Sequence, residues 1–546
     1  MLVSLSFVLI EKLDNYKEIQ IFFSQILEKQ AKKYTLNLKC IKNTQKEILA
    51  ILEGEEEKII NFSQNLSNHI PLSLQWTFKD FQIVQDLENF ENLNTTNTQI
   101  LQFLTPFESS KISDKKSEDF CNLWGDFTSF SQSKLTFLKD NKRVVITNAK
   151  GLQNALFYLA DLLKNQQSIF IKTIYGKKEL ILFDEKNKLD GKMEFYFMPF
   201  DLNNTQSLFK TKQEDLQALA TLEKPLINLT CKSIFIDFFN KDEIPCILPY
   251  EPILLLLSKF LEDFSGCYLL PLSDEKIQNG MCYYIPQDSK TLTISVAKNG
   301  LILPHRFKNI QNFALQEFQK TIKEENLEKV NALYLGKEKT LFYLYFNQAF
   351  KEAISFNFEC NLALFIEYLQ NENQTTQSLF KNFTQENKEL INTLQAQEKI
   401  TQKSNNLLDL LGLCGILLGF SYHLQEAQLL LMKEAKKFMG EKGPRIDFRL
   451  KKDSDNSLFL DTFQTLRSVM SFKLAGVEKD LLCFGILDSL AEFLANFSRD
   501  MEENYTTKGL ILSGSAILNK QFINQLIHYL PKNSEMYVTE YCDTEE

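Results

Sequence analysis

The sequence has 546 residues, of which 44% are hydrophobic and 24% are charged. At roughly 150 residues per domain, this length predicts three or four domains. The 61 basic and 70 acidic residues give a formal net charge of -9. Nucleic-acid-binding proteins usually carry a basic face, so we expect no nucleic-acid partner.

Ten cysteines and four histidines are scattered singly along the chain. No two cysteines lie within four residues of each other, so the sequence contains no CxxC pair of the kind that holds structural zinc. Most of the cysteines lie in apolar stretches such as GLCGILLG, which favours buried, reduced thiols in a reducing compartment. We therefore expect a cytoplasmic protein without zinc.

The N-terminal residues Met1–Glu11 are apolar, but no basic segment precedes them and no small-residue cleavage site follows. This pattern does not match a secretory signal. The longest apolar runs, Ile253–Leu257 and Leu410–Phe420, are shorter than the ~18–20 residues that span a bilayer. We expect no membrane insertion.

Residues 1–90 predict a compact α+β domain. Apolar alternation and helical spacing favour, in order, a strand at the N-terminus and then the following elements: helix Tyr16–Lys33, strands Leu36–Ile41 and Glu47–Leu52, helix Glu57–Asn68 and strand Trp76–Val84. This βαββαβ order is typical of the ferredoxin-like arrangement.

The rest of the chain predicts a linker and two larger domains. Residues 86–117 are rich in Asn, Thr, Ser and Asp, and we assign residues 91–139 to a linker. Residues 140–290 predict a mixed α/β domain, with paired strands over SIFIKTIYGKKELILF. Residues 291–546 predict a third domain, in which strands such as TLTISVAKNGLIL precede helices.

Three segments stand out: IPCILPYEPILLL at 244–256, NNLLDLLGLCGILLG at 405–419 and LILSGSAILNKQF at 510–522. In this order they resemble the hydrogenase maturation carbamoyltransferase family (HypF-like), and within it the HydE-type paralogues. The resemblance implies a multidomain α/β and α+β fold. Its domains would be acylphosphatase-like (residues 1–90), YrdC-like (140–290) and Kae1-like (291–546), the last a duplicated actin/Hsp70-type domain, and residues 91–139 would replace a zinc-finger region.

The resemblance also implies where acyl-phosphate groups would bind. In the first domain, Phe23 occupies the position of the family's phosphate-binding Arg, and Asn43 matches an Asn that orients water. In the second domain, Lys172 and Gly176 match the ends of a glycine-rich turn, but Thr173 and Tyr175 replace residues that the family keeps. Without glycines, a backbone turn approaches a phosphate less closely. A solvated lysine at a strand end is the alternative explanation of Lys172.

For the third domain, the resemblance implies a nucleotide site. Asp409 matches the family's acidic residue, and Ser513, Gly514 and Asn519 match a turn that cradles phosphates before a helix. The same turn is also compatible with a purely structural role. The family's metal-binding histidines and its closing Asn-Asp-Gly-Gly turn have no match, and the chain ends in YCDTEE. We therefore expect no bound cofactor, and at most weak binding of ATP with Mg²⁺.

The family is known to make a carbamoyl adenylate from carbamoyl phosphate and ATP, as the source of the cyanide ligand of [NiFe] hydrogenase. Three functions remain open for this sequence. The first is a maturation or assembly factor with reduced or no activity that binds a hydrogenase subunit or another maturation protein. The second is an active carbamoyltransferase whose ligands come from other positions. The third is a relative of the tRNA threonylcarbamoylation enzymes, against which the acidic charge weighs.

Overall fold

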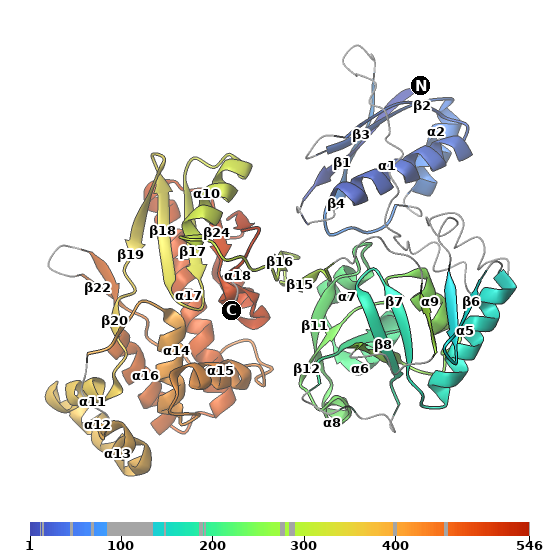
Figure 1. The fold of residues 1–546 in the computed structure, drawn as a ribbon. Helices are drawn as coiled ribbons and strands as arrows, with labels where there is room; N and C mark the ends of the chain where they lie inside the picture. The colour runs from blue at the N-terminus through green and yellow to red at the C-terminus, as the bar shows by residue number, and fades with distance from the viewer. Residues whose placement is uncertain are drawn as a thin grey trace. The chain divides into compact units, whose positions relative to one another are not determined.

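The computed structural model describes residues 1–10, 13, 16–43, 47–66, 70–84, 135–146, 149–184, 189, 193–272, 279–282, 290–396, 401–452 and 457–544. They fall into two compact units, Met1–Ile294 and Ser295–Glu546 (Figure 1). The predicted linker, residues 91–139, lies outside the described residues up to residue 134. The domain boundaries within each unit stay predictions.

The first part of the first unit has the predicted βαββαβ order. Its elements are β1 (Leu2–Leu9), α1 (Tyr16–Lys33), β2 (Asn37–Asn43), β3 (Glu47–Glu53), α2 (Glu56–Leu66) and β4 (Trp76–Ile83). The sheet order is β2-β3-β1-β4, with β1 antiparallel to both of its neighbours. Alternate residues Val3, Leu5 and Phe7 of β1 are buried in one core with the apolar face of α1. The predicted elements of this part are therefore confirmed.

The second part of the first unit is built on one large mixed sheet. Its order is β15-β11-β12-β9-β13-β8-β7-β14-β5-β6. The strands are β5 (Thr136–Lys139), β6 (Lys142–Val145), β7 (Ile169–Thr173), β8 (Gly176–Leu182), β9 (Tyr196–Pro199), β11 (Leu226–Cys231), β12 (Glu243–Cys246), β13 (Gly266–Pro271), β14 (Gly280–Cys282) and β15 (Thr293–Val296). The apolar residues of α5 (Ala149–Lys164) and α9 (Pro252–Lys259) share one core with β7, β8 and β13.

A buried carboxylate joins these two parts of the first unit. Glu223 is 3% exposed. It accepts hydrogen bonds from Ser73 Oγ at 2.5 Å, from the Leu74 N–H at 3.0 Å and from Gln75 Nε2 at 3.3 Å. Its neighbour Leu222 packs into the core of the first part. A charge buried in this way is stable only while its donors stay in place.

The second unit contains a five-stranded sheet of order β19-β18-β17-β24-β25. Its strands are β17 (Val330–Leu335), β18 (Thr340–Phe346), β19 (Ala349–Ile354), β24 (Leu510–Ser513) and β25 (Met536–Val538). The first three strands form an antiparallel meander, and β24 is parallel to both β17 and β25. The parallel ladder places the end of β24 beside the end of β17, which is where the candidate site lies.

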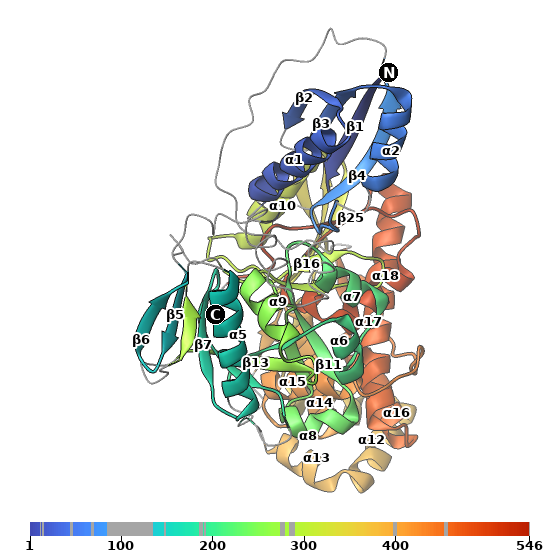
Figure 2. The same ribbon diagram turned by 90° about the vertical axis from the view of Figure 1, so that its right-hand side faces the viewer.

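Helices of the second unit pack tightly on one another. Helix α14 (Leu407–Leu418) contacts α15 (Leu424–Ala435) and α16 (Thr462–Leu474), and α15 contacts α17 (Lys479–Tyr505). Figure 2 labels these four helices in a second view. A Cβ added at Gly412 or Gly415 would lie 2.5 Å from backbone carbonyls of α15. The glycines of the segment LLGLCGILLG therefore allow α14 and α15 to approach each other closely.

Helix α17 is long and apolar enough to cross a membrane by length and composition alone. However, 78% of its apolar window is buried inside the unit. Its apolar side chains, among them Leu487 and Leu494, belong to the main hydrophobic core. A helix that is apolar on most sides is expected at the centre of a large core.

Candidate functional site

In the first unit, the LPYEP segment at 248–252 meets the turn between β7 and β8. Strands β7 and β8 are joined by the two residues Ile174 and Tyr175, and the LPYEP segment packs against this turn. The Tyr250 hydroxyl donates to Thr173 Oγ1 at 3.1 Å, and the Tyr175 and Tyr250 rings lie 4.8 Å apart. Glu251 is fully buried, and its Oε1 accepts the Ile174 N–H at 2.5 Å.

The β7–β8 turn is therefore already filled by this chain's own side chains. The Tyr175 N–H also has a partner, because it donates to Thr173 Oγ1 at 3.1 Å. Burial and the neighbouring Glu251 carboxylate raise the pKa of Tyr175, so the phenol stays neutral. Lys172 and Gly176 lie in this hairpin, Lys172 near the end of β7 and Gly176 at the start of β8 with a positive φ of 84°. Between them, Thr173, Ile174 and Tyr175 contact Tyr250 and Glu251, two residues that the sequence analysis did not select as site residues.

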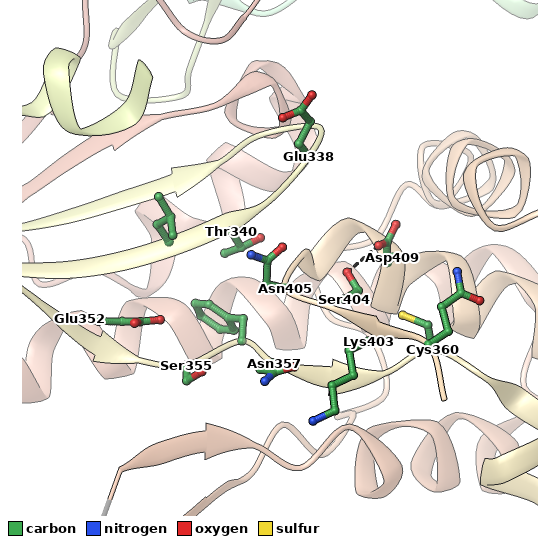
Figure 3. Close-up of a pocket in the computed structure, with 13 residues that line it drawn as sticks. Glu338, Thr340, Glu352, Ser355, Asn357, Cys360, Lys403, Ser404, Asn405 and Asp409 are labelled. Carbon is green, nitrogen blue, oxygen red and sulfur yellow. Dashed lines mark hydrogen bonds between the residues drawn. The ribbon is translucent and has the colours of Figure 1, made fainter. Parts of the chain in front are cut away.

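In the second unit, Asp409 lies in the first turn of α14. Asn406 caps this helix, since its side chain accepts the Leu408 N–H at 3.0 Å. The Ser404 hydroxyl donates to Asp409 Oδ2 at 2.6 Å. Figure 3 shows this pair at a cavity of about 630 Å³, which is lined by Glu338, Thr340, Leu341, Glu352, Ser355, Phe356, Asn357, Cys360, Gln402, Lys403, Ser404, Asn405 and Asp409.

The lining of this cavity favours binding over nucleophilic chemistry. Three carboxylates and three side-chain amides surround a single ammonium group, that of Lys403. Burial and the nearby Asp409 carboxylate raise the pKa of the Cys360 thiol to about 12. The thiol is therefore protonated at neutral pH and is a poor nucleophile.

The predicted phosphate turn follows β24. Gly514 has a φ of 100°, and a Cβ added there would lie 2.2 Å from the backbone carbon of Leu335. Ser513 is fully buried, and its Oγ accepts from Thr539 Oγ1 at 2.8 Å. Asn519 caps α18 (Lys520–Tyr529) by accepting the Phe522 N–H at 3.0 Å. All three predicted residues thus have clear structural roles at this turn.

A carboxylate near the end of the chain lies against the same turn. Asp543 is fully buried. Its Oδ2 accepts the Ser515 N–H at 3.0 Å and the Lys337 N–H at 3.2 Å, while its Oδ1 accepts the Tyr334 hydroxyl at 2.5 Å. Sequence comparison found no match for the closing segment, and therefore missed this residue. No local pattern in the sequence distinguishes Asp543 from an exposed carboxylate.

The turn between β17 and β18 connects the cavity to the phosphate turn. Lys337 donates its N–H to Asp543, and its carbonyl oxygen accepts from Asn406 Nδ2 at 2.5 Å. Asn406 in turn caps the helix that carries Asp409. Asp409 and the Ser513–Asn519 turn are thus linked through the β17–β18 hairpin. No residue of the Ser513–Asn519 turn lines the cavity.

The first domain offers less at its predicted site. Phe23 lies inside α1, is 1% exposed, and makes an edge-to-face contact with Phe7 at a centroid distance of 5.6 Å. It is a core residue within a helix, and it does not lie at the entrance to a phosphate site. Asn43 ends β2, where it pairs with Ile48, and its side chain lies outside the described residues.

Metal ligands are not grouped in the part of the chain that the structure describes: no three His, Cys, Asp or Glu side chains are positioned to share an ion. Burial lowers the pKa of His305 to about 4, and its Nε2 lies 2.8 Å from Ser295 Oγ. Whether the protein binds zinc or ATP with Mg²⁺ stays a prediction.

Comparisons with known proteins place the chain in a family. No protein-family model matches it. Protein HydE of Wolinella succinogenes is 32% identical over 533 residues, which cover 94% of this chain and 95% of that protein. Among solved structures, full-length HypF in a phosphate- and nucleotide-bound form has a TM-score of 0.58 at 12% identity, and covers 100% of this chain and 96% of its own. HypF of T. kodakarensis gives the same values.

The likeness to HypF confirms the predicted fold class, with acylphosphatase-like, YrdC-like and Kae1-like parts. At 12% identity it establishes the fold alone. The likeness to HydE is closer and spans almost the whole chain, so it also establishes descent. The chain belongs to the HydE family of proteins with a HypF-type fold.

Proposed function

We propose that this chain is a cytoplasmic [NiFe] hydrogenase maturation factor that binds a hydrogenase subunit or another maturation protein and has little or no carbamoyltransferase activity. Its membership of the HydE family supports the maturation role. The observation that carries the loss of activity is the closed β7–β8 turn. There the Glu251 carboxylate holds the Ile174 N–H, and the Tyr175 and Tyr250 rings pack over the turn.

The physical argument concerns charge. A turn binds a phosphate or carbamoyl phosphate through free N–H groups that point at the anion. Here a fully buried carboxylate already accepts one of those N–H groups. A second anion at the same place would be repelled by Glu251. It would also have to displace the packed rings of Tyr175 and Tyr250. Charge repulsion and steric hindrance therefore both oppose substrate binding at this turn.

Nucleotide binding gives the first test. We expect isothermal calorimetry with ATP and Mg²⁺ to detect millimolar affinity or none, which corresponds to a binding free energy of about -4 kcal/mol or weaker. The reason is that the Gly514 and Ser515 N–H groups of the predicted phosphate turn already have acceptors within the chain, the Cys542 carbonyl and the Asp543 carboxylate. Micromolar binding that is lost in Asp409→Asn would instead favour the active-carbamoyltransferase alternative.

Complementation gives the second test. In a strain that lacks the gene, we expect the double variant Lys172→Ala/Asp409→Asn to restore hydrogenase activity to within about twofold of the wild type. The two side chains are the main charged candidates for substrate binding, and a binding scaffold does not need them. A loss of hydrogenase activity of more than about tenfold, with the variant present at wild-type protein levels, would contradict the proposal.

A further inference from the structure

Strand β4 forms an edge of the N-terminal sheet, whose order is β2-β3-β1-β4. Only Trp76 of this strand is buried, and the residues from Thr77 to Ile83 are exposed or half-buried. Three of the exposed side chains are large and apolar, since Phe78 is 53%, Phe81 36% and Ile83 70% exposed. An exposed edge strand with apolar side chains is a template for pairing with another strand.

A bulge lies at the centre of β4. The register between β1 and β4 shifts by one residue at Lys79, which has no partner on β1. Phe78 pairs with Phe7 on one side of the shift. Phe81 pairs with Leu5 on the other side, and both of these β1 residues belong to the core. Side chains alternate between the two faces of a regular strand, so Phe78 and Phe81 share a face only because of the bulge.

The backbone groups of β4 follow the same symmetry. The residues that flank the strand both bond towards β1. The Gln75 carbonyl accepts the N–H of the residue after β1 at 2.7 Å, and the Val84 N–H donates to the Leu2 carbonyl at 3.0 Å. Backbone groups alternate in direction along a strand. Counting inward from these two ends, the N–H and C=O groups of Phe78 and Phe81 both point away from β1.

We propose that β4 is a homodimer interface, at which two copies of the chain join their N-terminal sheets around a two-fold axis between Lys79 and Asp80. Antiparallel pairing about this axis places Phe78 opposite Phe81 of the second copy, and Lys79 opposite Asp80 of the second copy. The first contact buries apolar surface, the second pairs opposite charges, and symmetry repeats both. The inference goes beyond the proposed maturation role, and it holds whether the chain is a scaffold or an enzyme.

A second copy fits this edge better than an arbitrary strand does. Charged side chains and bulges normally prevent edge strands from pairing. A regular strand that pairs with Phe81 and Ile83 falls out of step at the bulge, whereas a second β4 has its own bulge at the facing position. The ion pair between Lys79 and Glu47, at 3.4 Å, lies at the surface and is therefore weak. It does not prevent the Lys79 ammonium from contacting a second copy.

The dimer should be weak, because one strand pair with a short apolar border buries less surface than a permanent dimer does. We expect a Kd on the order of 10 µM. In more dilute solution the chain is a monomer, and its Phe78, Phe81 and Ile83 side chains are exposed to water.

Sedimentation velocity of the full chain tests the pairing through charge. Lys79→Asp gives each copy two adjacent carboxylates at the axis, and Asp80→Lys gives each copy two adjacent ammonium groups. Each variant alone should raise the Kd at least about tenfold, because like charges then face each other. An equimolar mixture of the two variants should associate about as tightly as the wild type. Lys32→Asp, an exposed control in the last turn of α1, should leave the Kd unchanged.

Three results would overturn the proposal: a wild-type monomer at about 100 µM, a dimer that Lys79→Asp leaves intact, or folded variants that fail to associate when mixed. Hydrogen exchange of the wild type guards against misfolding of the variants. The amides of Phe78 and Phe81 should exchange about fourfold more slowly at about 100 µM than at about 1 µM, the ratio of the monomer fractions for the expected Kd. Equal protection at both concentrations would mean that another part of the chain covers β4, and would also overturn the proposal.

Discussion

Gly514→Ala is expected to destabilise the second unit by about 3 kcal/mol or more, which combines the strain of a positive φ with overpacking. The new Cβ would lie 2.2 to 2.5 Å from the carbon, oxygen and nitrogen of Leu335, all of them backbone atoms of the central strand β17. Backbone in the middle of a sheet cannot move aside as a flexible side chain can. Thermal unfolding followed by circular dichroism measures the loss as a fall in Tm.

Gly300→Ala is the matched control. Gly300 also has a positive φ, 85°, but an added Cβ there would have no neighbour within 4 Å. This variant should lose only about 1 kcal/mol, from backbone strain alone. If the two variants were equally stable, the close approach of Gly514 to β17 would be refuted. If a Gly514 variant loses function, the loss can therefore be attributed to ligand binding only after the variant has been shown to be folded.

Phe23→Arg is expected to destabilise the first domain by about 3–5 kcal/mol, because it removes a core aromatic ring and buries a guanidinium. The substitution would restore the residue type that the resemblance implies at this position. It should nevertheless give no acylphosphatase activity, since residue 23 lies on the core face of α1. Chemical denaturation and hydrolysis of benzoyl phosphate by the full chain measure the two outcomes.

Phe78→Arg provides the comparison for this experiment. Phe78 lies on β4 and contacts the same Phe7 ring, at a centroid distance of 5.7 Å. Unlike Phe23, Phe78 is 53% exposed. An Arg there keeps its charge in water, so we expect a change of at most about 1 kcal/mol. Rapid hydrolysis of benzoyl phosphate by a folded Phe23→Arg protein would contradict the placement of residue 23 in the core.

The case of Phe23 also illustrates what the sequence could and could not predict. Its spacing from Ile19, Ile26 and Leu27 is that of one face of a helix, and the structure buries that face in the core. The family resemblance assigned Phe23 to a phosphate site. Local patterning was the better guide, because a match in residue order does not determine which way a side chain points.

The residues that sequence analysis missed are buried carboxylates. Glu251 and Asp543 are both fully buried and hold backbone N–H groups of turns that are distant in sequence. A single Asp or Glu is normally expected at the surface, and no local pattern distinguishes the rare buried ones. Their partners become visible only when β7 is brought beside the LPYEP segment and β24 beside the closing segment. By contrast, Lys172, Gly176 and Asp409 were selected because they match family motifs in residue order.

The hydrogen bonds around Glu223 have a consequence for how the protein is divided in experiments. A fragment that ends near residue 90 would retain Ser73, Leu74 and Gln75 but lose the carboxylate that they contact. The complementary fragment would keep a buried charge without its donors, which is a strongly destabilising state. Each side of this contact depends on the other, so we expect neither fragment to fold as stably alone as it does within the full chain. If the N-terminal domain were fused to another protein, that protein would need to supply a carboxylate in place of Glu223, within hydrogen-bonding distance of Ser73, Leu74 and Gln75.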